Sequence, residues 1–208
     1  MANKDHSLDQ GIIDAAFREF TEHGFEKASM RKIAANANVT VGAIYTRYPT
    51  KDALFISLVA PLLERIATGF EEIRKGYEHV SVTDPKKGAA QLIDAMGMES
   101  EAILHLLFDD YDRAKLLLTK SRGSSLEHFF DEIVDRKITE TVAFFEAGGL
   151  PHPKPEILRL MVSGQFHMYF EIMEEGCELE TAREMMKAAV CYHTGGWYAL
   201  LGLTKKED

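Results

Sequence analysis

Five basic residues and no acidic residue lie in one 25-residue stretch of the chain, which reads KASMRKIAANANVTVGAIYTRYPTK. The basic residues are Lys27, Arg31, Lys32, Arg47 and Lys51. The chain as a whole carries a formal net charge of −9. Lys and Arg side chains gain free energy next to phosphates because condensed counterions are released. The stretch therefore predicts a surface that contacts DNA.

The charge is divided unevenly between the two parts of the chain. Residues 1–51 hold seven basic and six acidic residues, a net charge of +1, whereas residues 52–208 hold 17 and 27, a net charge of −10. A strongly acidic surface repels nucleic acid. We therefore expect the N-terminal part alone to contact DNA.

A first helix is predicted to position this basic stretch. Ser7 and Gln10 have the spacing of a capping box, and Gly24 supplies a left-handed stop. Apolar residues recur on one helical face between them: Ile12, Ile13, Ala16, Phe17 and Phe20.

Two short helices are expected to follow within the basic stretch. Ser29 is a candidate N-cap for a helix that reaches Ala35, and Thr40 is a candidate N-cap for a helix that ends near Tyr48. The Asn-rich segment 36–38 separates them, and Asn tolerates positive φ better than other non-glycine residues. Three short helices with a tight turn before the third predict a helix-turn-helix.

The rest of the chain also shows helical periodicity and a helix-favouring composition with six prolines. Pro61 lies inside the predicted fourth helix and should bend it. The fold class is therefore all-α, with an N-terminal three-helix domain, a larger C-terminal helical domain and about nine helices. After the first three, the predicted helical segments are 50–77, 85–96, 103–107, 116–118, 126–145, 156–175 and 181–203.

Composition indicates a soluble protein of a reducing compartment, with the cytoplasm as the expected location. Hydrophobic residues make up 46% and charged residues 27% of the chain, and Cys177 and Cys191 are too few for a disulfide framework. The N-terminal ten residues contain no apolar core of a secretory signal. The longest uncharged run, 188–204, has 17 residues and is too short and polar to span a membrane. We expect no membrane partner.

The sequence contains no complete motif for catalysis or metal binding. His105 and Asp109 share a helical face, but no HExxH motif or paired cysteine ligands accompany them. No nucleophile elbow or phosphate loop occurs, so we expect no catalytic residue, no metal and no cofactor. Two alternatives stay open. One is an all-α enzyme using dispersed His and Asp residues, which leaves the acid-free stretch unexplained, and the other is a helix-turn-helix module that binds protein.

The run from Ile12 to Phe55 resembles the N-terminal signature of TetR-family transcriptional regulators. The resemblance covers about a quarter of the chain and fixes residues in order that include Ala15, Phe20, Gly24, Ile33, Ala34, Val39, Gly42, Tyr45, Lys51 and Leu54. It implies an all-α homodimer, with a DNA-binding domain at 1–51 and an effector-binding and dimerisation domain at 52–208. It also implies a palindromic double-stranded operator and, most often, a repressor that a small hydrophobic effector releases.

The resemblance also implies which residues contact DNA. The third helix would lie in the major groove, with Ile44 and Tyr48 facing the core. Asn38 and Arg47 depart from the family pattern, which usually has Gly and often His there. Ser29 has the alternative role of an N-cap only. The expected DNA-contacting residues are Ser29, Thr40, Gly42, Tyr45, Thr46, Arg47 and Lys51.

The larger domain is expected to hold the effector pocket and the dimer interface. A broad apolar face on the last two helices predicts a four-helix bundle with a second copy, although both helices could pack within one chain. The predicted pocket residues are Ile66, Phe70, Met96, Leu107, Phe130, Gln165 and Tyr169. The predicted interface residues are Met161, Phe166, Met186, Ala189, His193, Gly196, Trp197 and Leu200.

Overall fold

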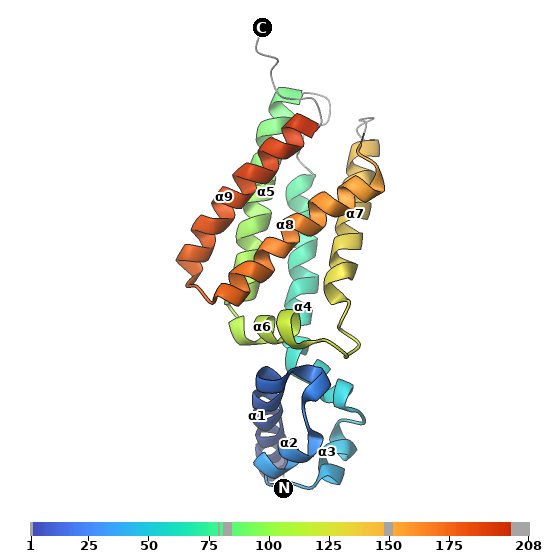
Figure 1. Cartoon of the computed structure of the whole chain (residues 1–208), viewed down its shortest axis with the longest axis vertical. Helices are drawn as coiled ribbons and strands as arrows, with labels where there is room; N and C mark the ends of the chain where they lie inside the picture. Colours follow the sequence, from blue (N-terminus) through green and yellow to red (C-terminus); the bar gives the residue numbers. More distant parts are fainter. Residues whose placement is uncertain (1, 79, 81–84, 148–151, 201–208) are drawn as a thin grey trace. The chain divides into compact units, whose positions relative to one another are not determined.

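The chain folds into α-helices, as a computed structural model that describes residues 2–78, 80, 85–147 and 152–200 shows (Figure 1). These residues form nine helices and no β-strand, which confirms the predicted all-α fold. The helices are α1 (Ala2–Lys27), α2 (Met30–Asn36), α3 (Val41–Arg47), α4 (Lys51–Tyr77), α5 (Pro85–Phe108), α6 (Tyr111–Lys120), α7 (Phe129–Ala147), α8 (Pro155–Glu175) and α9 (Leu179–Leu200).

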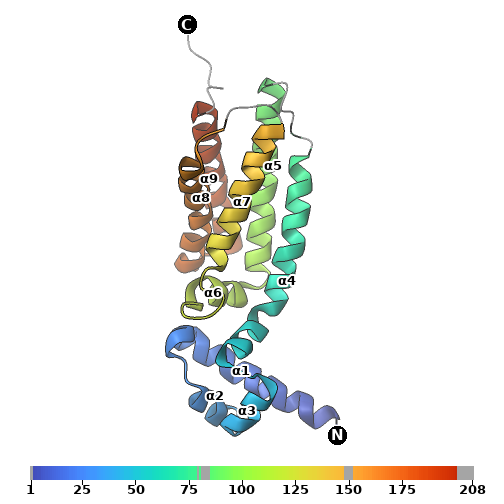
Figure 2. The ribbon, with the colours of Figure 1, turned by 90° about the vertical axis from the view of Figure 1, so that its right-hand side faces the viewer.

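The chain forms two compact units, and its path passes between them more than once. The first unit comprises residues 1–65 and 110–129, and the second comprises 66–109 and 130–208. In the first unit α1 packs against both α2 and α6, and α2 packs against α3 (Figure 2). This unit therefore contains the start of α4 and all of α6 in addition to the three helices predicted within residues 1–51.

The helix boundaries of the first unit follow their predicted caps, with one exception. Helix α1 begins at Ala2, so the expected start at Ser7 is wrong. Gly24 has φ of 73° and interrupts the regular helix, as predicted. Ser29 and Thr40 are the N-caps of α2 and α3, and Asn38 in the turn between them has φ of 54°. Asn38 thus adopts the left-handed conformation that the tight turn requires.

An aromatic cluster forms the centre of the first unit. The ring of Phe20 lies 5.2 Å from that of Phe55, and the ring of Phe25 lies 5.4 Å from Phe55, both edge to face. Edge-to-face pairs at this separation add to the free energy of simple apolar burial. Ile33 and Ile44 are fully buried, so α2 and α3 are held by the same core.

Helix α4 continues through Pro61 and begins at a cap that the sequence predicts. The hydroxyl of Thr50 accepts a hydrogen bond from the Ala53 amide at 2.9 Å. A proline inside a helix leaves nearby carbonyls short of donors. Arg113 of α6 donates from Nε to the carbonyl oxygen of Leu58 at 2.7 Å, and so stabilises the turn before Pro61.

Helix α4 is also long and apolar enough, by length and composition alone, to cross a membrane. Its apolar residues up to Pro61 have another role, because Leu54, Phe55, Leu58 and Val59 are at most 2% exposed within the first unit. A core helix of a soluble protein satisfies the same compositional test.

In the second unit α5 is one helix, where the sequence predicts separate helices at 85–96 and 103–107. The prediction fails because the intervening face is polar but buried: Glu99 is 2% and Ser100 is 5% exposed. Helix α5 also lies close to α4, since a Cβ added at Gly69 would meet Leu106 Cδ1 at 2.7 Å.

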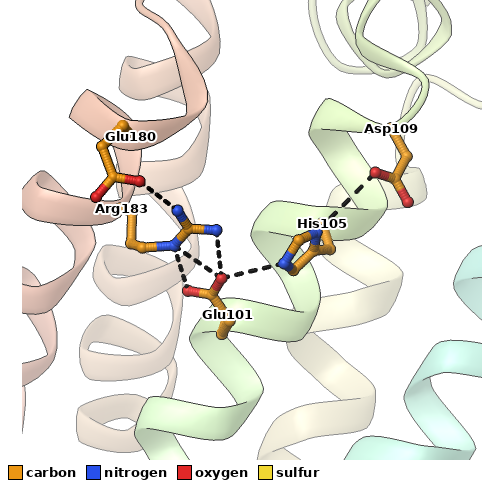
Figure 3. Close-up of polar contacts among 5 residues, drawn as sticks. All are labelled: Glu101, His105, Asp109, Glu180 and Arg183. Carbon is orange, nitrogen blue, oxygen red and sulfur yellow. Dashed lines mark hydrogen bonds and ion pairs between the residues drawn. The ribbon is translucent and has the colours of Figure 1, made fainter.

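Helix α5 packs along α9 (Figure 1). Figure 3 shows the polar contacts at their surface, where Arg183 Nε donates to both carboxylate oxygens of Glu101 at 2.8 and 3.0 Å. His105 Nε2 lies 3.1 Å from Glu101 Oε1, and His105 Nδ1 lies 4.0 Å from Asp109. The Arg183 guanidinium lowers the pKa of Glu101 below its ordinary value. His105 and Asp109 therefore belong to an ion-pair network; among the described residues no group of His, Cys, Asp and Glu could hold a metal.

Candidate functional site

The N-terminus of α2 is held by a buried carboxylate. The Ser29 backbone amide donates to Glu19 Oε1 at 2.9 Å, and Glu19 is 4% exposed. The Ser29 hydroxyl accepts from the Lys32 amide at 3.4 Å. The backbone amide and the hydroxyl of Ser29 therefore both have hydrogen-bond partners within the chain. This supports the alternative role of Ser29 as an N-cap. Arg31 and Lys32 are exposed on α2.

Helix α3 has one buried side and one open side. Ile44 is fully buried, whereas Tyr45 is 42% exposed and Thr46 is exposed. Gly42 is also exposed, and a Cβ added there would meet only the Thr40 hydroxyl, at 3.8 Å. Among the described residues, no packing contact therefore requires glycine at this position. The exposed side of α3 thus presents bare backbone at Gly42, together with the Tyr45 ring and the Thr46 hydroxyl.

Arg47 has a partner that sequence reasoning missed. Its Nε donates a short hydrogen bond to Asp9 Oδ1 of α1, and its Nη1 lies 3.5 Å from the Ala43 carbonyl oxygen. The Arg47 side chain is 26% exposed. In this structure the guanidinium is thus turned toward α1, and contact with a base edge requires it to leave Asp9.

Lys51 is also engaged within the first unit. Its Nζ donates to the Glu26 carbonyl oxygen at 3.2 Å and lies 4.8 Å from the centre of the Phe25 ring. Burial lowers the pKa of Lys51, while Glu19 and Glu26 act in the opposite direction. Lys51 is the first residue of α4, so its ammonium connects the start of α4 to the end of α1.

The second unit contains a cavity of about 340 Å³, which aromatic and charged side chains line together. The aromatic lining comes from α4, α7 and α9: Phe70, Tyr77, Phe144, Phe145 and Trp197. The charged lining consists of Arg74, Glu78, Glu99, Lys137 and Glu140. Such a combination is typical of small-molecule sites, in which apolar walls enclose a few polar groups that fix orientation.

A buried polar cluster lies in this cavity. Lys137 Nζ lies 2.6 Å from Glu99 Oε1, and the Tyr77 hydroxyl donates a short hydrogen bond to Glu99 Oε2. The ammonium of Lys137 also lies 4.4 Å from the centre of the Tyr77 ring. Burial, followed by the nearby Glu99 carboxylate, raises the pKa of Tyr77 above its ordinary value. Tyr77 therefore stays a neutral donor at all physiological pH values.

The exposed rim of the cavity carries a second set of charges. Arg74 pairs with Glu71 and Glu78, each at 3.2 Å, and the three side chains are at least half exposed. These contacts raise the pKa of Arg74, with the hydrogen bond to Glu71 as the largest cause. Exposed pairs of this kind contribute little to stability, so these charges matter chiefly for the field at the rim.

The predicted pocket residues divide into two groups. Phe70, Met96 and Gln165 line the cavity. Tyr169 does not line it: the side chain is 3% exposed, and its hydroxyl has no hydrogen-bond partner within the described structure. The other residues outside the lining are Ile66, Leu107 and Phe130.

The predicted interface residues divide in a similar way. Phe166, Met186 and His193 are at most 9% exposed within the single chain. They are buried because the most apolar stripe of each helix packs inside the chain. Trp197 lines the cavity. Met161 and Ala189 are partly exposed and Gly196 is exposed, while the side chain of Leu200 lies outside the described part.

The central cavity residues Glu99 and Lys137 were missed from sequence, although one pattern points to Glu99. It follows Met96 by three positions and precedes Ile103 by four, so it lies on the inward face of α5. A charged residue in an apolar stripe requires a partner. Lys137 lies 38 residues away, and sequence spacing does not reveal the pair.

The structure thus combines a helix-turn-helix, whose third helix is exposed, with a second helical unit that contains a cavity of small-molecule size. This combination is typical of DNA-binding regulators that have a separate helical domain. Residues 12–58 match the family model described as bacterial regulatory proteins, tetR family. The match covers the three N-terminal helices and the start of α4, and it confirms the resemblance seen in this part of the sequence.

Known proteins show where the likeness extends. The HTH-type nicotine-responsive transcriptional repressor HdnoR of Paenarthrobacter nicotinovorans is 34% identical over 71 residues, which are 34% of this chain and 37% of that protein. A TetR-like transcriptional regulator from Rhodococcus sp. RHA1 has the same fold, with a TM-score of 0.58 at 18% identity, over 94% of this chain and 96% of the other. FadR from Bacillus halodurans gives a TM-score of 0.59 at 20% identity, over 90% and 98%.

Proposed function

We propose that this chain is a DNA-binding transcriptional regulator, acting as a repressor on a palindromic operator. The observation that carries the proposal is the open side of α3, where Gly42 faces free space next to exposed Tyr45 and Thr46. A recognition helix of this kind enters the major groove with its exposed side chains toward base edges. HdnoR, which matches this chain over about a third of its own length, is named a repressor. Action on DNA places the protein in the cytoplasm.

In this proposal the cavity of the second unit binds a small effector, and its occupancy releases the operator. The lining provides apolar walls and a buried polar cluster in the volume range of ligand sites. An effector must bind the released state more tightly than the DNA-bound state, by about 1–3 kcal/mol for ordinary allosteric coupling.

The outer faces of α8 and α9 are the proposed dimer interface. Leu160 is 68% and Tyr192 is 75% exposed, and Ile157 and Met185 are at least 40% exposed. Large apolar side chains exposed together mark interaction surfaces. The Leu160→Glu and Tyr192→Glu variants should shift the protein from dimer to monomer in sedimentation velocity. A monomeric wild type would overturn this part.

The DNA-binding proposal is tested by selection from a random pool of duplexes with the full chain, followed by anisotropy titrations at several salt concentrations. We expect an enriched sequence with two related half-sites about one helical turn apart. Tyr45→Ala should weaken binding by about tenfold on that sequence. Lys75→Ala is the matched control, since Lys75 is exposed in the acidic second unit. Absence of enrichment, or equal effects of the two variants, would reject DNA reading by α3.

A further inference from the structure

We propose that the cavity of the second unit is built for a monovalent organic cation with an apolar or aromatic body, and that Glu99 is its counter-ion. The claim rests on the proposed function only in assigning the occupant the role of an effector. The binding itself is a separate property of the cavity.

Glu99 is a buried carboxyl group at the inner wall of the cavity. Its side chain is 2% exposed and lies on α5, within the lining of the cavity. A buried carboxylate without a positive partner costs several kcal/mol. Glu99 therefore requires a cation beside it at all times, and one side chain provides that cation when no ligand is bound.

Lys137 marks where a ligand cation is stabilised. Its ammonium lies 2.6 Å from Glu99 Oε1 and 4.4 Å from the centre of the Tyr77 ring. An ammonium group at that point gains from the carboxylate and from the π face together. The position has the recognition chemistry of an amine site, with a lysine of the chain itself as occupant. A ligand ammonium can take this place if Lys137, whose long side chain is 16% exposed, turns outward to water.

An anionic ligand fits the same cavity less well. It would compete with Glu99 for the Lys137 ammonium, and the Tyr77 hydroxyl is the other partner of this buried carboxylate among the described residues. The exchange of Lys137 for a ligand cation has no such cost, because the displaced charge moves to solvent. Binding of a cation therefore costs less free energy than binding of an anion at this position.

The other charged residues of the lining also favour a cation. Three carboxylates, Glu78, Glu99 and Glu140, face two basic groups, Arg74 and Lys137. Arg74 is already paired with Glu71 and Glu78, and Glu140 is exposed. The rim therefore attracts a cation from solution. Five aromatic side chains in the lining then supply faces for its body.

The test uses three probes of equal chain length and different charge, namely decylammonium, decanol and decanoate below their micellar concentrations. Trp197 is the only tryptophan of the chain and lines the cavity, so its fluorescence reports occupancy directly, and calorimetry gives the affinity. We expect the ammonium probe to bind the full-length protein about tenfold or more tightly than the other two.

Single variants test the roles of Glu99 and Lys137 separately. Glu99→Gln should weaken binding of the ammonium probe by about tenfold while leaving decanol nearly unchanged. Lys137→Met should strengthen the ammonium probe, because the internal competitor is gone. If Glu99→Gln does not fold, Glu140→Gln at the exposed rim should weaken the cation severalfold, with exposed Glu146→Gln on the same helix as its control.

Tighter binding of decanoate than of the ammonium probe, an unchanged preference in Glu99→Gln or in Glu140→Gln, or no response of Trp197 to any probe would overturn the inference. Operator affinity is measured separately by anisotropy. Loss of DNA binding with intact cation binding would reject the proposed function alone, whereas intact DNA binding without cation preference would reject the cation site alone.

Discussion

The backbone amide of Ser29 donates a hydrogen bond to Oε1 of Glu19, 2.9 Å away, and Glu19 is 4% exposed. The two residues lie ten positions apart, so the contact fixes the N-terminus of α2 onto the last turns of α1. A carboxylate that accepts from a free amide at a helix start is doubly favoured, by the hydrogen bond and by the helix dipole.

Removing this carboxylate should destabilise the first unit. We expect Glu19→Ala to lower the free energy of unfolding by about 1–3 kcal/mol, because the partly buried Ser29 amide loses its hydrogen-bond partner. Urea denaturation followed by circular dichroism measures the change. Glu22→Ala is the matched control, because Glu22 is 75% exposed on the same helix. Equal stabilities of the two variants would show that the contact contributes nothing.

Asp9 should lower the affinity of the protein for DNA. Asp9→Ala removes the carboxylate that accepts from Arg47 Nε and with it a negative charge, so we expect a severalfold tighter complex with the selected duplex. Arg47→Ala should weaken the complex by about tenfold. Anisotropy titration reports both, with Asp14→Ala as control for loss of one charge from α1, where Asp14 bonds to Gln10. Weaker binding by Asp9→Ala would mean that Arg47 serves to hold α1.

Gly42→Ala should move stability and DNA affinity in opposite directions. The added methyl group meets only the Thr40 hydroxyl at 3.8 Å, and alanine favours a helix over glycine by about 0.5–1 kcal/mol. The free protein should therefore be equally or more stable to heat. The same methyl group would lie between α3 and the groove, so affinity should fall. A destabilised variant would contradict the open space seen at Gly42.

His193 should make stability depend on pH. Burial lowers the pKa of His193 below its ordinary value, and its Nε2 has no hydrogen-bond partner in the described structure. The unfolded chain therefore binds the proton more readily than the folded one. Stability should fall as pH drops below the unfolded pKa near 6.5, until the lowered folded pKa is passed.

Melting temperatures at pH 7.5 and 5.5 test this prediction. The His193→Leu variant should lose part of the decrease that the wild type shows. The control is His167→Gln, since the His167 side chain is 64% exposed beside Glu171 and should leave the decrease intact. An identical pH response of wild type and His193→Leu would exclude His193 as the cause.

Local rules account for most of what could be predicted from sequence. The caps Ser29, Thr40 and Thr50 and the turn at Asn38 are where capping and φ preferences place them, because these depend on neighbouring residues. Helix periodicity likewise finds Ile44 as the buried residue of α3.

Pairings between distant residues escaped sequence analysis. The partner of Arg47 lies 38 positions away on α1, and Glu99 and Lys137 are separated by the same interval. The prediction of two separate helices in place of α5 was wrong because Glu99 and Ser100 are polar but buried. They interrupt the apolar pattern without interrupting the helix. Apolar periodicity alone also does not separate an interface from a core, and strongly apolar Phe166 and Met186 are buried within their own chain.

Helix α6 belongs to the first unit although its sequence is inserted between segments of the second. A fragment that ends after residue 65 would lack the helix that covers α1, and would also lack Ser125, whose amide and hydroxyl both donate to Asp52 at 2.8 Å. Any attempt to express the first unit alone must therefore include residues 110–129, joined by circular permutation or by a designed linker. The covalent path of the chain makes the first unit depend on a segment that follows part of the second unit.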